Sequence, residues 1–272
     1  MKLSCLPVSY FAEITAGKMT VADWARMGAS LKLDAVDLSI LFLPERTEAA
    51  AAALRGRIEA EGIGVAMLTT YPDFTHPDPA QRALELEQEV QAVKIAAALG
   101  ARFIRVTDGQ AHPGTSRSNG IAWAAESLTR LVDLAGDLGV QLAFENHAKP
   151  GAWTYTDFSQ PPEIYLEILS KVPPQLGVNF DTGNATAYAA DPLDFLDQVL
   201  GRVVSVHAAD TATRGELNHV LLGTGVTPFE ELFHCLKSSG WDGWICMEEA
   251  SRQGRWGVET AANYIRRTWA AA

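Results

Sequence analysis

Residues 95–108 read IAAALGARFIRVTD, in which an alanine- and leucine-rich stretch ends at Gly100 and a β-branched run follows at once. The stretch before the glycine is typical of a helix, and the glycine is typical of a left-handed helix C-cap. The run after it predicts a buried strand. The same unit recurs as RIEAEGIGVAMLTT (57–70), LAGDLGVQLAFEN (134–146) and LKSSGWDGWICMEE (236–249). The chain is therefore expected to alternate helices and strands.

Followed along the whole chain, this pattern predicts eight strands and eight helices. The strands are expected near 2–6, 35–39, 64–70, 102–107, 141–146, 175–181, 203–208 and 243–248. The helices are expected over 20–31, 47–61, 79–99, 118–138, 161–171, 192–200, 227–239 and 257–269. Strict alternation predicts a parallel sheet, and eight repeats predict a closed (β/α)8 TIM barrel. We expect an α/β fold with one domain over residues 1–272. A doubly wound open sheet is the alternative, but it usually has fewer strands, and no GxGxxG follows the first strand.

The composition disfavours several classes of function. The chain has 272 residues, 47% of them hydrophobic, and its 22 Lys and Arg against 33 Asp and Glu give a net charge of −11. That charge opposes binding to a nucleic acid or to an acidic membrane surface. Three cysteines without a CxxC do not make a disulfide framework. With no signal peptide and no long apolar run, we expect a soluble, cytoplasmic protein.

Each of the last four predicted strands ends in one side chain that could bind a metal. Along each of these strands, every second residue is apolar and is expected to face the helices. These residues are Leu142, Phe144, Val178, Phe180, Val204, Val206, Ile245 and Met247. The opposite parity ends in Glu145, Asp181, His207 and Glu248, at separations of 36, 26 and 41 residues. Because the carboxyl ends of barrel strands meet at one mouth, these four side chains are expected to converge.

Three carboxylates in one place repel one another unless a cation neutralises them. Three carboxylates and one imidazole form a ligand set for a divalent ion such as Mn²⁺, Mg²⁺, Co²⁺ or Zn²⁺. The alternative is four unrelated polar strand ends, each hydrogen-bonded separately.

Four motifs around these residues resemble the metal motifs of the xylose isomerase-like TIM barrel superfamily. They are FEN (144–146), VNFDTGN (178–184), VHAAD (206–210) and MEEA (247–250). The superfamily includes sugar and sugar-phosphate isomerases and epimerases, inosose dehydratases and apurinic-site endonucleases. The resemblance implies that Glu145, Asp181, His207 and Glu248 bind one divalent ion, often Mn²⁺. It also implies a small carbohydrate or polyol substrate, and it is compatible with a homo-oligomer.

The resemblance also implies that Glu145 and Glu248 act as an acid/base pair. An α-hydroxy ketone bound to the metal through two oxygens has an acidified C–H, because the cation stabilises the enediolate. One glutamate would remove the proton, and a second donor would return it. Asp181 and His207 come between the glutamates in strand order and are expected to be ligands only. Glu249 has the outward parity and is expected on the helix side.

The sequence departs from the family pattern at two places. Epimerases of this type commonly carry a histidine three residues after the aspartate of the sixth strand, where this chain has Asn184. We expect Asn184 to contact substrate, with altered contacts to a hydroxyl. The endonucleases need further histidines on strands 3, 4 and 7, but strand 3 ends in Thr69-Thr70 and strand 4 in Thr107-Asp108. A three-metal cluster is therefore not expected.

Four other side chains are candidates for binding substrate. Arg105 has the inward parity on the fourth strand, where it would bind substrate or form a buried ion pair. Arg214 lies in the loop after the seventh strand, where family members often place a substrate-contacting arginine; the alternative is a solvated loop charge. His147 shares the parity of Glu145 and would reach substrate or orient that glutamate, or make a surface hydrogen bond. Trp153 would wall a cavity against a sugar, or only pack within its loop.

Three functions remain open at this point. The first is a metal-dependent isomerase or epimerase of a small ketose or related hydroxy-carbonyl compound. The second is a dehydratase of the inosose type, which would begin with the same proton abstraction and then expel a hydroxyl. The third is a non-catalytic barrel that binds a metal and a sugar, which the intact ligand set disfavours. No glycine-rich phosphate cradle is evident, and this favours an unphosphorylated substrate. Fold analogy alone does not decide the reaction.

Overall fold

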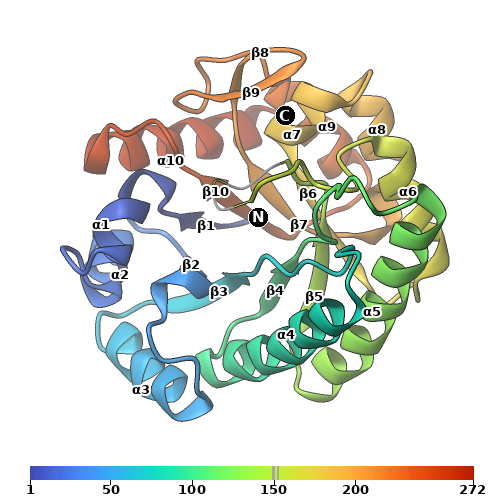
Figure 1. The fold of residues 1–272 in the computed structure, drawn as a ribbon. Coiled ribbons are helices and arrows are strands. Elements are labelled where there is room, and N and C mark those ends of the chain that lie inside the picture. The colour runs from blue at the N-terminus through green and yellow to red at the C-terminus, as the bar shows by residue number, and fades with distance from the viewer. Residues whose placement is uncertain (149–150, 152) are drawn as a thin grey trace.

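Eight parallel strands form a barrel at the centre of the structure, a computed structural model that describes all residues except 149, 150 and 152 (Figure 1). The strands are β1 (Lys2–Leu6), β2 (Ala35–Ser39), β3 (Gly64–Thr69), β4 (Phe103–Val106), β5 (Gln141–Glu145), β6 (Gly177–Asp181), β7 (Val203–Ala208) and β10 (Trp244–Glu248). They are hydrogen-bonded in the order β2-β3-β4-β5-β6-β7-β10-β1. Strands β1 and β2 lie side by side, where Asp34 N donates to Leu3 O at 2.8 Å. The predicted (β/α)8 barrel in one domain is confirmed.

A ring of helices surrounds the barrel (Figure 1). The predicted helices are present as α2 (Val21–Ser30), α3 (Glu48–Glu59), α4 (Pro79–Leu99), α5 (Arg117–Asp137), α6 (Pro162–Lys171), α8 (Pro192–Val199), α9 (Phe229–Ser238) and α10 (Gly254–Ala271). Gly100 has φ 70° and forms the left-handed C-cap of α4, as predicted. Asp78 begins the same helix by accepting from Ala80 N at 2.9 Å.

Several short elements that the pattern did not predict lie in the connections between the strands and the main helices. They are the helices α1 (Phe11–Thr15) and α7 (Thr182–Tyr188), three 3₁₀ turns, and an antiparallel hairpin of β8 (Thr211–Thr213) and β9 (Glu216–His219). Helix α7 follows β6 directly, and the hairpin follows β7. Both therefore lie at the carboxyl end of the barrel, where the sites of such barrels are built.

The main core lies between the outer face of the strands and the helices. Phe144, Phe180 and Ile245 are fully buried there, and burial of such side chains is the main stabilising term of the fold. A second, small apolar cluster contains Met67, Phe103 and Cys246.

Val204 was expected to face the helices, and this prediction is wrong, because Val204 packs against the second cluster. The β6–β7 register explains the difference: Val178 pairs with Val203, but the next residue, Asn179, pairs with Ser205. Such an irregularity changes the alternation of side chains along a strand.

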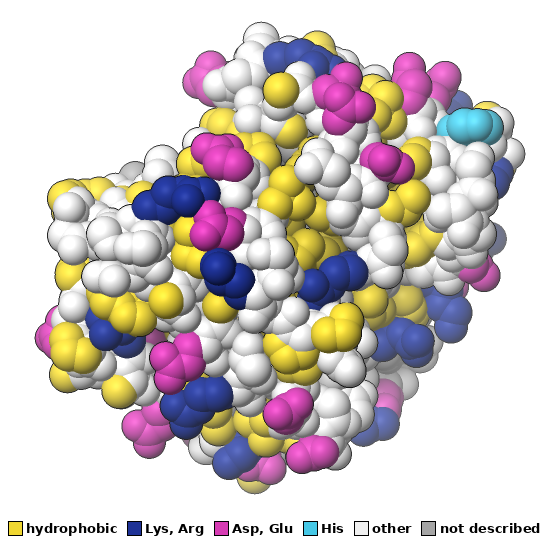
Figure 2. All heavy atoms as spheres, turned by 90° about the vertical axis from the view of Figure 1, so that its right-hand side faces the viewer, with side chains coloured by type: hydrophobic (Ala, Val, Ile, Leu, Met, Phe, Trp, Pro, Cys, Tyr) yellow, Lys and Arg dark blue, Asp and Glu magenta, His cyan; other side chains and the backbone are white. Residues whose placement is uncertain are grey.

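The surface carries charges of both signs. Figure 2 shows the face that lies on the right in Figure 1, and on this face Lys and Arg side chains are interspersed with Asp and Glu. The net charge of −11 therefore does not form a single acidic patch on this face. Among the described residues, no helix has both the length and the apolar character needed to span a membrane.

Candidate metal centre

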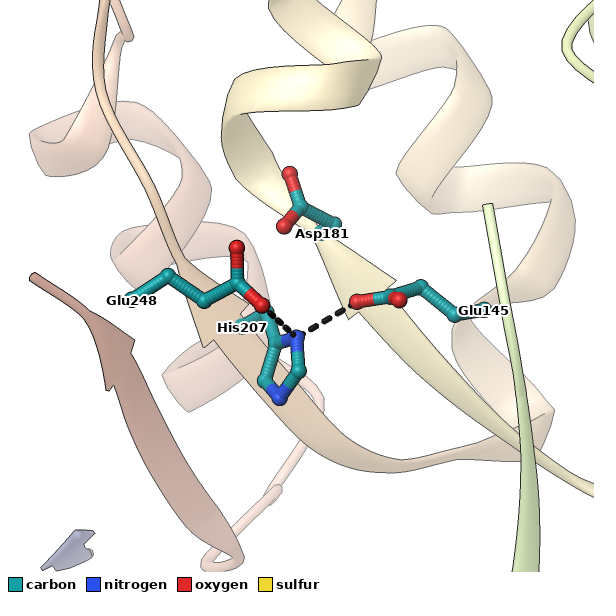
Figure 3. Close-up of side chains that lie close together, drawn as sticks. All are labelled: Glu145, Asp181, His207 and Glu248. Carbon is teal, nitrogen blue, oxygen red and sulfur yellow. Dashed lines mark ion pairs between the residues drawn. The ribbon is translucent and has the colours of Figure 1, made fainter. Parts of the chain in front are cut away.

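Four side chains from four neighbouring strands converge at the carboxyl end of the barrel (Figure 3). Glu145 ends β5, Asp181 ends β6, His207 lies near the end of β7, and Glu248 ends β10. Each offers one ligand atom, and these atoms all lie within 4.8 Å of one another. Glu145, Asp181 and His207 are buried, whereas the Glu248 side chain is 13% exposed. The structure therefore brings together the residues that strand parity selected, and their role as ligands remains a prediction.

The His207 imidazole lies between two of the carboxylates. Its Nδ1 is 2.5 Å from Glu145 Oε1 and 3.1 Å from Glu248 Oε1 (Figure 3). Burial alone would lower the pKa of His207, but the charges of Glu145 and Glu248 outweigh burial and raise the pKa well above its ordinary value. The nitrogen that faces both carboxylates can hold a proton there, or it can offer its lone pair to a cation.

Asp181 shows most directly that a cation fits this cluster. Its Oδ1 accepts from Asn184 N at 2.6 Å, because Asp181 is also the N-cap of α7. Its Oδ2 is buried and has no hydrogen-bond partner in the described chain. Burial, followed by repulsion from Glu145 and Glu248, raises the pKa of Asp181 well above its ordinary range. A divalent ion would satisfy the unpartnered oxygen and remove the repulsion, so the donor set fits such an ion.

The two glutamates are held in their ionised form by neighbouring charges. Burial alone would raise the pKa of Glu145, but Arg105 and His207 outweigh burial and lower it. Burial also opposes ionisation of Glu248, and the charge of His207 nevertheless holds the pKa of Glu248 well below its ordinary value. Both side chains are therefore carboxylates that can bind a cation or accept a proton.

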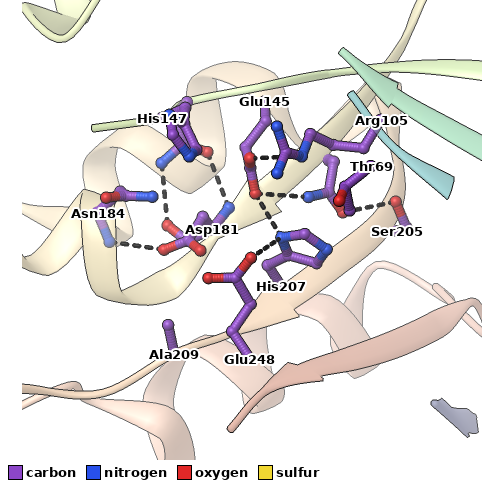
Figure 4. Close-up of polar contacts among 12 residues, drawn as sticks. Thr69, Arg105, Glu145, His147, Asp181, Asn184, Ser205, His207, Ala209 and Glu248 are labelled. Carbon is purple, nitrogen blue, oxygen red and sulfur yellow. Dashed lines mark hydrogen bonds and ion pairs between the residues drawn. The ribbon is translucent and has the colours of Figure 1, made fainter. Parts of the chain in front are cut away.

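A layer of polar side chains supports the ligands from inside the barrel (Figure 4). Asn179 Nδ2 donates to Glu145 Oε1 at 2.9 Å, and Ser205 Oγ donates to Asn179 Oδ1 at 2.7 Å. Neither residue was predicted to belong to the site. They lie two positions before Asp181 and His207, so the strand parity that selected the ligands also indicated that these side chains point inward.

Two side chains of the β5–α6 loop, Asn146 and His147, make further contacts near the ligands. Asn146 Nδ2 donates to Asp181 O at 2.9 Å, and Asn146 Oδ1 accepts from Asp181 N at 2.8 Å. His147 Nδ1 lies 3.0 Å from Oδ2 of the fully buried Asp157, and its ring meets the Tyr71 ring edge-on at 6.2 Å. Asp157 therefore orients the His147 ring, which the sequence could not show.

The remaining predicted substrate contacts fall into two groups. Asn184 and His147 line one small cavity of about 10 Å³ together with side chains of α6, α7 and α8, and Asn184 Oδ1 is buried without a partner in the described chain. Arg105 is fully buried, with its Nε 3.0 Å from Glu145 Oε2. Arg214 is exposed at the turn between β8 and β9, and Trp153 is half-buried in the β5–α6 loop. None of the hydrogen bonds or ion pairs found among the described residues joins Arg214 or Trp153 to the four ligands, and their contact with substrate remains a prediction.

Asp210 anchors the loop that carries the hairpin, a role that the sequence analysis did not identify. Its Oδ2 accepts from Gly223 N and Gly225 N, each at 2.9 Å, and its Oδ1 accepts from Thr227 N at 3.1 Å. Glu249 is buried beside α10, where its Oε1 accepts from Ser251 N at 2.9 Å, in agreement with the expected helix side.

Comparison with known proteins agrees with the barrel fold. The family described as xylose isomerase-like TIM barrel matches residues 25–268. The inosose dehydratase of Lacticaseibacillus casei is 26% identical over 140 residues, which are 46% of this chain and 45% of that protein. The match thus spans less than half the length of that curated relative.

Solved structures show the same fold over nearly the whole chain. A D-tagatose 3-epimerase-like protein superimposes with a TM-score of 0.81 at 20% identity, and the match covers 100% of this chain and 98% of the other. The IOLI protein with a bound zinc atom superimposes with a TM-score of 0.77 at 18% identity, over 98% and 96% of the two chains. Because the family match extends over most of its length, the chain belongs to the xylose isomerase-like TIM barrel family.

Proposed function

We propose that this chain is a divalent-metal-dependent isomerase or epimerase of a small sugar, ketose or related hydroxy-carbonyl compound. The observation that carries the proposal is the cluster of Glu145, Asp181, His207 and Glu248, whose ligand atoms lie within 4.8 Å of one another. The buried, unpartnered Oδ2 of Asp181 supports a cation at the same place.

The four clustered side chains would hold the ion. When bound, a divalent ion would withdraw electron density from the carbonyl and hydroxyl oxygens of the substrate. The C–H bond on the hydroxyl-bearing carbon next to the carbonyl would then be more acidic. We propose Mn²⁺ as the metal, with Mg²⁺, Co²⁺ and Zn²⁺ as alternatives, because carboxylate oxygens and one imidazole accommodate each of these ions. The bound zinc of the IOLI protein supports including zinc among the metals tested.

The two glutamates would move the proton. Strands β6 and β7 lie between β5 and β10 in the sheet, so Glu145 and Glu248 approach the centre of the mouth from different directions. One carboxylate removes the proton from the carbon next to the carbonyl, and the same or the other residue returns a proton to the substrate. Asp181 and His207 come from the two intervening strands and act as ligands.

The substrate would lie beside the β5–α6 loop and the start of α7. Asp157 holds His147 through Nδ1, and none of the hydrogen bonds found among the described residues involves His147 Nε2, which would contact a hydroxyl of the substrate. Asn184 lies next to it across the small cavity, within the same turn that contains Asp181. The cavity itself has room for no more than about one water molecule, so a polyol would contact these two side chains from the mouth of the barrel.

A dehydratase of the inosose type is the second candidate. The sequence similarity to the inosose dehydratase of L. casei, 26% identity over 140 residues, favours this reaction. Such an enzyme would use the same proton abstraction and then lose a hydroxyl from the neighbouring carbon. The metal cluster therefore suits both reactions, and the products distinguish them.

The test is hydrogen exchange and product analysis with a panel of small molecules. Protein stripped with EDTA and reloaded with Mn²⁺ is incubated in D₂O with ketoses, inososes and hydroxypyruvate, and ¹H NMR follows each compound. We expect one compound to lose a C–H signal next to its carbonyl and to give an isomer or epimer. Loss of water from that compound would support the dehydratase instead. Absence of exchange with every compound, or equal exchange by the Asp181→Ala variant, would contradict the proposal.

A further inference from the structure

Arg105 is held on three sides inside the barrel. Its side chain is fully buried, and its Nη1 donates to Thr70 O at 2.8 Å. The guanidinium carbon lies 4.6 Å from the centre of the Tyr71 ring, and Nε lies 3.0 Å from Glu145 Oε2 (Figure 4). A side chain fixed in this way cannot turn into the mouth without breaking all three contacts. Its position therefore points to a task beside Glu145 rather than to contact with substrate.

The two oxygens of Glu145 have different surroundings because of Arg105. Oε2 faces the guanidinium, whereas Oε1 faces His207 Nδ1 and accepts from Asn179 Nδ2. Glu248 lacks such support, since His207 is its only ion-pair partner among the described residues. Glu145 is thus oriented in advance, with one oxygen turned to the other ligands.

We propose that Arg105 is a positioning residue of the metal centre and its permanent counter-ion. It holds Glu145 by Oε2 before any metal is bound, and its positive charge weakens the binding of a cation. Three carboxylates, one guanidinium and a divalent ion carry no net charge together, whereas the same site without Arg105 would be negative when loaded. An arginine suits this role because it stays charged when buried. The inference rests on the proposal that the four clustered side chains bind a divalent ion.

The test combines the stability of the metal-free protein with its affinity for Mn²⁺. In the EDTA-treated Arg105→Gln variant, Glu145 loses its permanent counter-ion, and we expect the melting temperature to fall by about 6 °C or more. Titration calorimetry should show that the same variant binds Mn²⁺ at least about tenfold more tightly than the wild type, because a repelling charge has been removed. A purely structural arginine would lower the melting temperature and leave the Mn²⁺ affinity unchanged.

Two further variants separate charge from packing. Arg202 is a partly buried arginine whose hydrogen bonds go to the backbone oxygens of Leu169, Pro173 and Leu176. The matched control Arg202→Gln should lose stability and keep its Mn²⁺ affinity. The double variant Arg105→Gln/Glu145→Gln removes both charges and should melt at a higher temperature than Arg105→Gln alone.

The outcomes distinguish this inference from the proposed function. If the wild type binds no divalent ion, the proposed function fails. If the wild type binds Mn²⁺ and Arg105→Gln binds it equally or more weakly, only the role of Arg105 is overturned. Should Arg105→Gln not fold without metal, the charge-keeping Arg105→Lys variant must fold and bind Mn²⁺ within about threefold of the wild type. Failure of both variants to fold would assign Arg105 to packing and overturn the inference.

Discussion

Glu89 offers a test of how the barrel holds buried charge near the site. This residue of α4 is only 4% exposed, and its Oε1 accepts from Thr70 Oγ1 at 2.6 Å. Burial raises the pKa of Glu89 to about 7, although the hydrogen bond from Thr70 and the charge of Arg105 lower it. The backbone oxygen of Thr70 in turn accepts from Arg105, so Glu89 supports the segment that holds Arg105.

The effect of Glu89 on stability depends on pH in a defined direction. The unfolded carboxyl titrates near 4.5 and the folded one near 7, so the folded state binds this proton more tightly. The stability that the proton contributes is complete below pH 4.5 and is lost as the pH rises through 7. At about 1.4 kcal/mol per pH unit, the ionised carboxyl lowers the free energy of unfolding by about 3 kcal/mol at pH 8.

The substitution Glu89→Gln keeps an oxygen that accepts from Thr70 and removes the charge. We expect the variant to match the wild type near pH 4.5 and to melt on the order of 6 °C higher at pH 8. Differential scanning calorimetry between pH 4.5 and 8 measures this difference, with Glu87→Gln at an exposed position of the same helix as the control. A difference between Glu89→Gln and the wild type that does not change with pH would show that ionisation of Glu89 does not destabilise the fold.

Two further predictions concern the site, and a third concerns the loop that carries the hairpin. Glu145→Gln and Glu248→Gln should each lower turnover by about 10²–10⁴ in the exchange assay, because each loses a proton acceptor; near-full turnover in both would disprove their catalytic role. His207→Ala should weaken Mn²⁺ binding by more than about tenfold in calorimetry while the circular dichroism spectrum is preserved, and unchanged affinity would remove His207 from the ligand set. Gly225→Ala should lower the melting temperature, because its Cβ would lie 2.2 Å from Thr211 O; an unchanged melting temperature would show that the loop rearranges freely.

Regular alternation explains why the barrel and the cluster of four ligands could be predicted. Side chains of a strand alternate between the two faces, and parallel strands end at the same rim, so Glu145 and Asp181 had to meet once their strands were identified. Val204 broke this rule, because the irregular register between β6 and β7 turned it inward. The pairing of strand residues is a tertiary property that a single strand does not encode.

Partners far apart in the sequence could not be predicted. The sequence indicated that Arg105 points into the barrel, where it could bind either substrate or a carboxylate. Only the folded structure shows that its partner is Glu145. The bond between His147 and Asp157 depends on how the β5–α6 loop closes. Helix α7 was missed because it is short and begins directly after Asp181, which both ends β6 and caps the helix.

Glu145, Asp181, His207 and Glu248 are proposed to bind one divalent ion. Anomalous diffraction at the manganese edge, from crystals of EDTA-treated protein soaked in MnCl₂, tests this claim most directly. We expect one peak per chain, within about 2.0–2.6 Å of one oxygen or nitrogen atom of each of the four side chains. The absence of a peak at this place, or two or three peaks bound by further histidines, would contradict a site for one divalent ion.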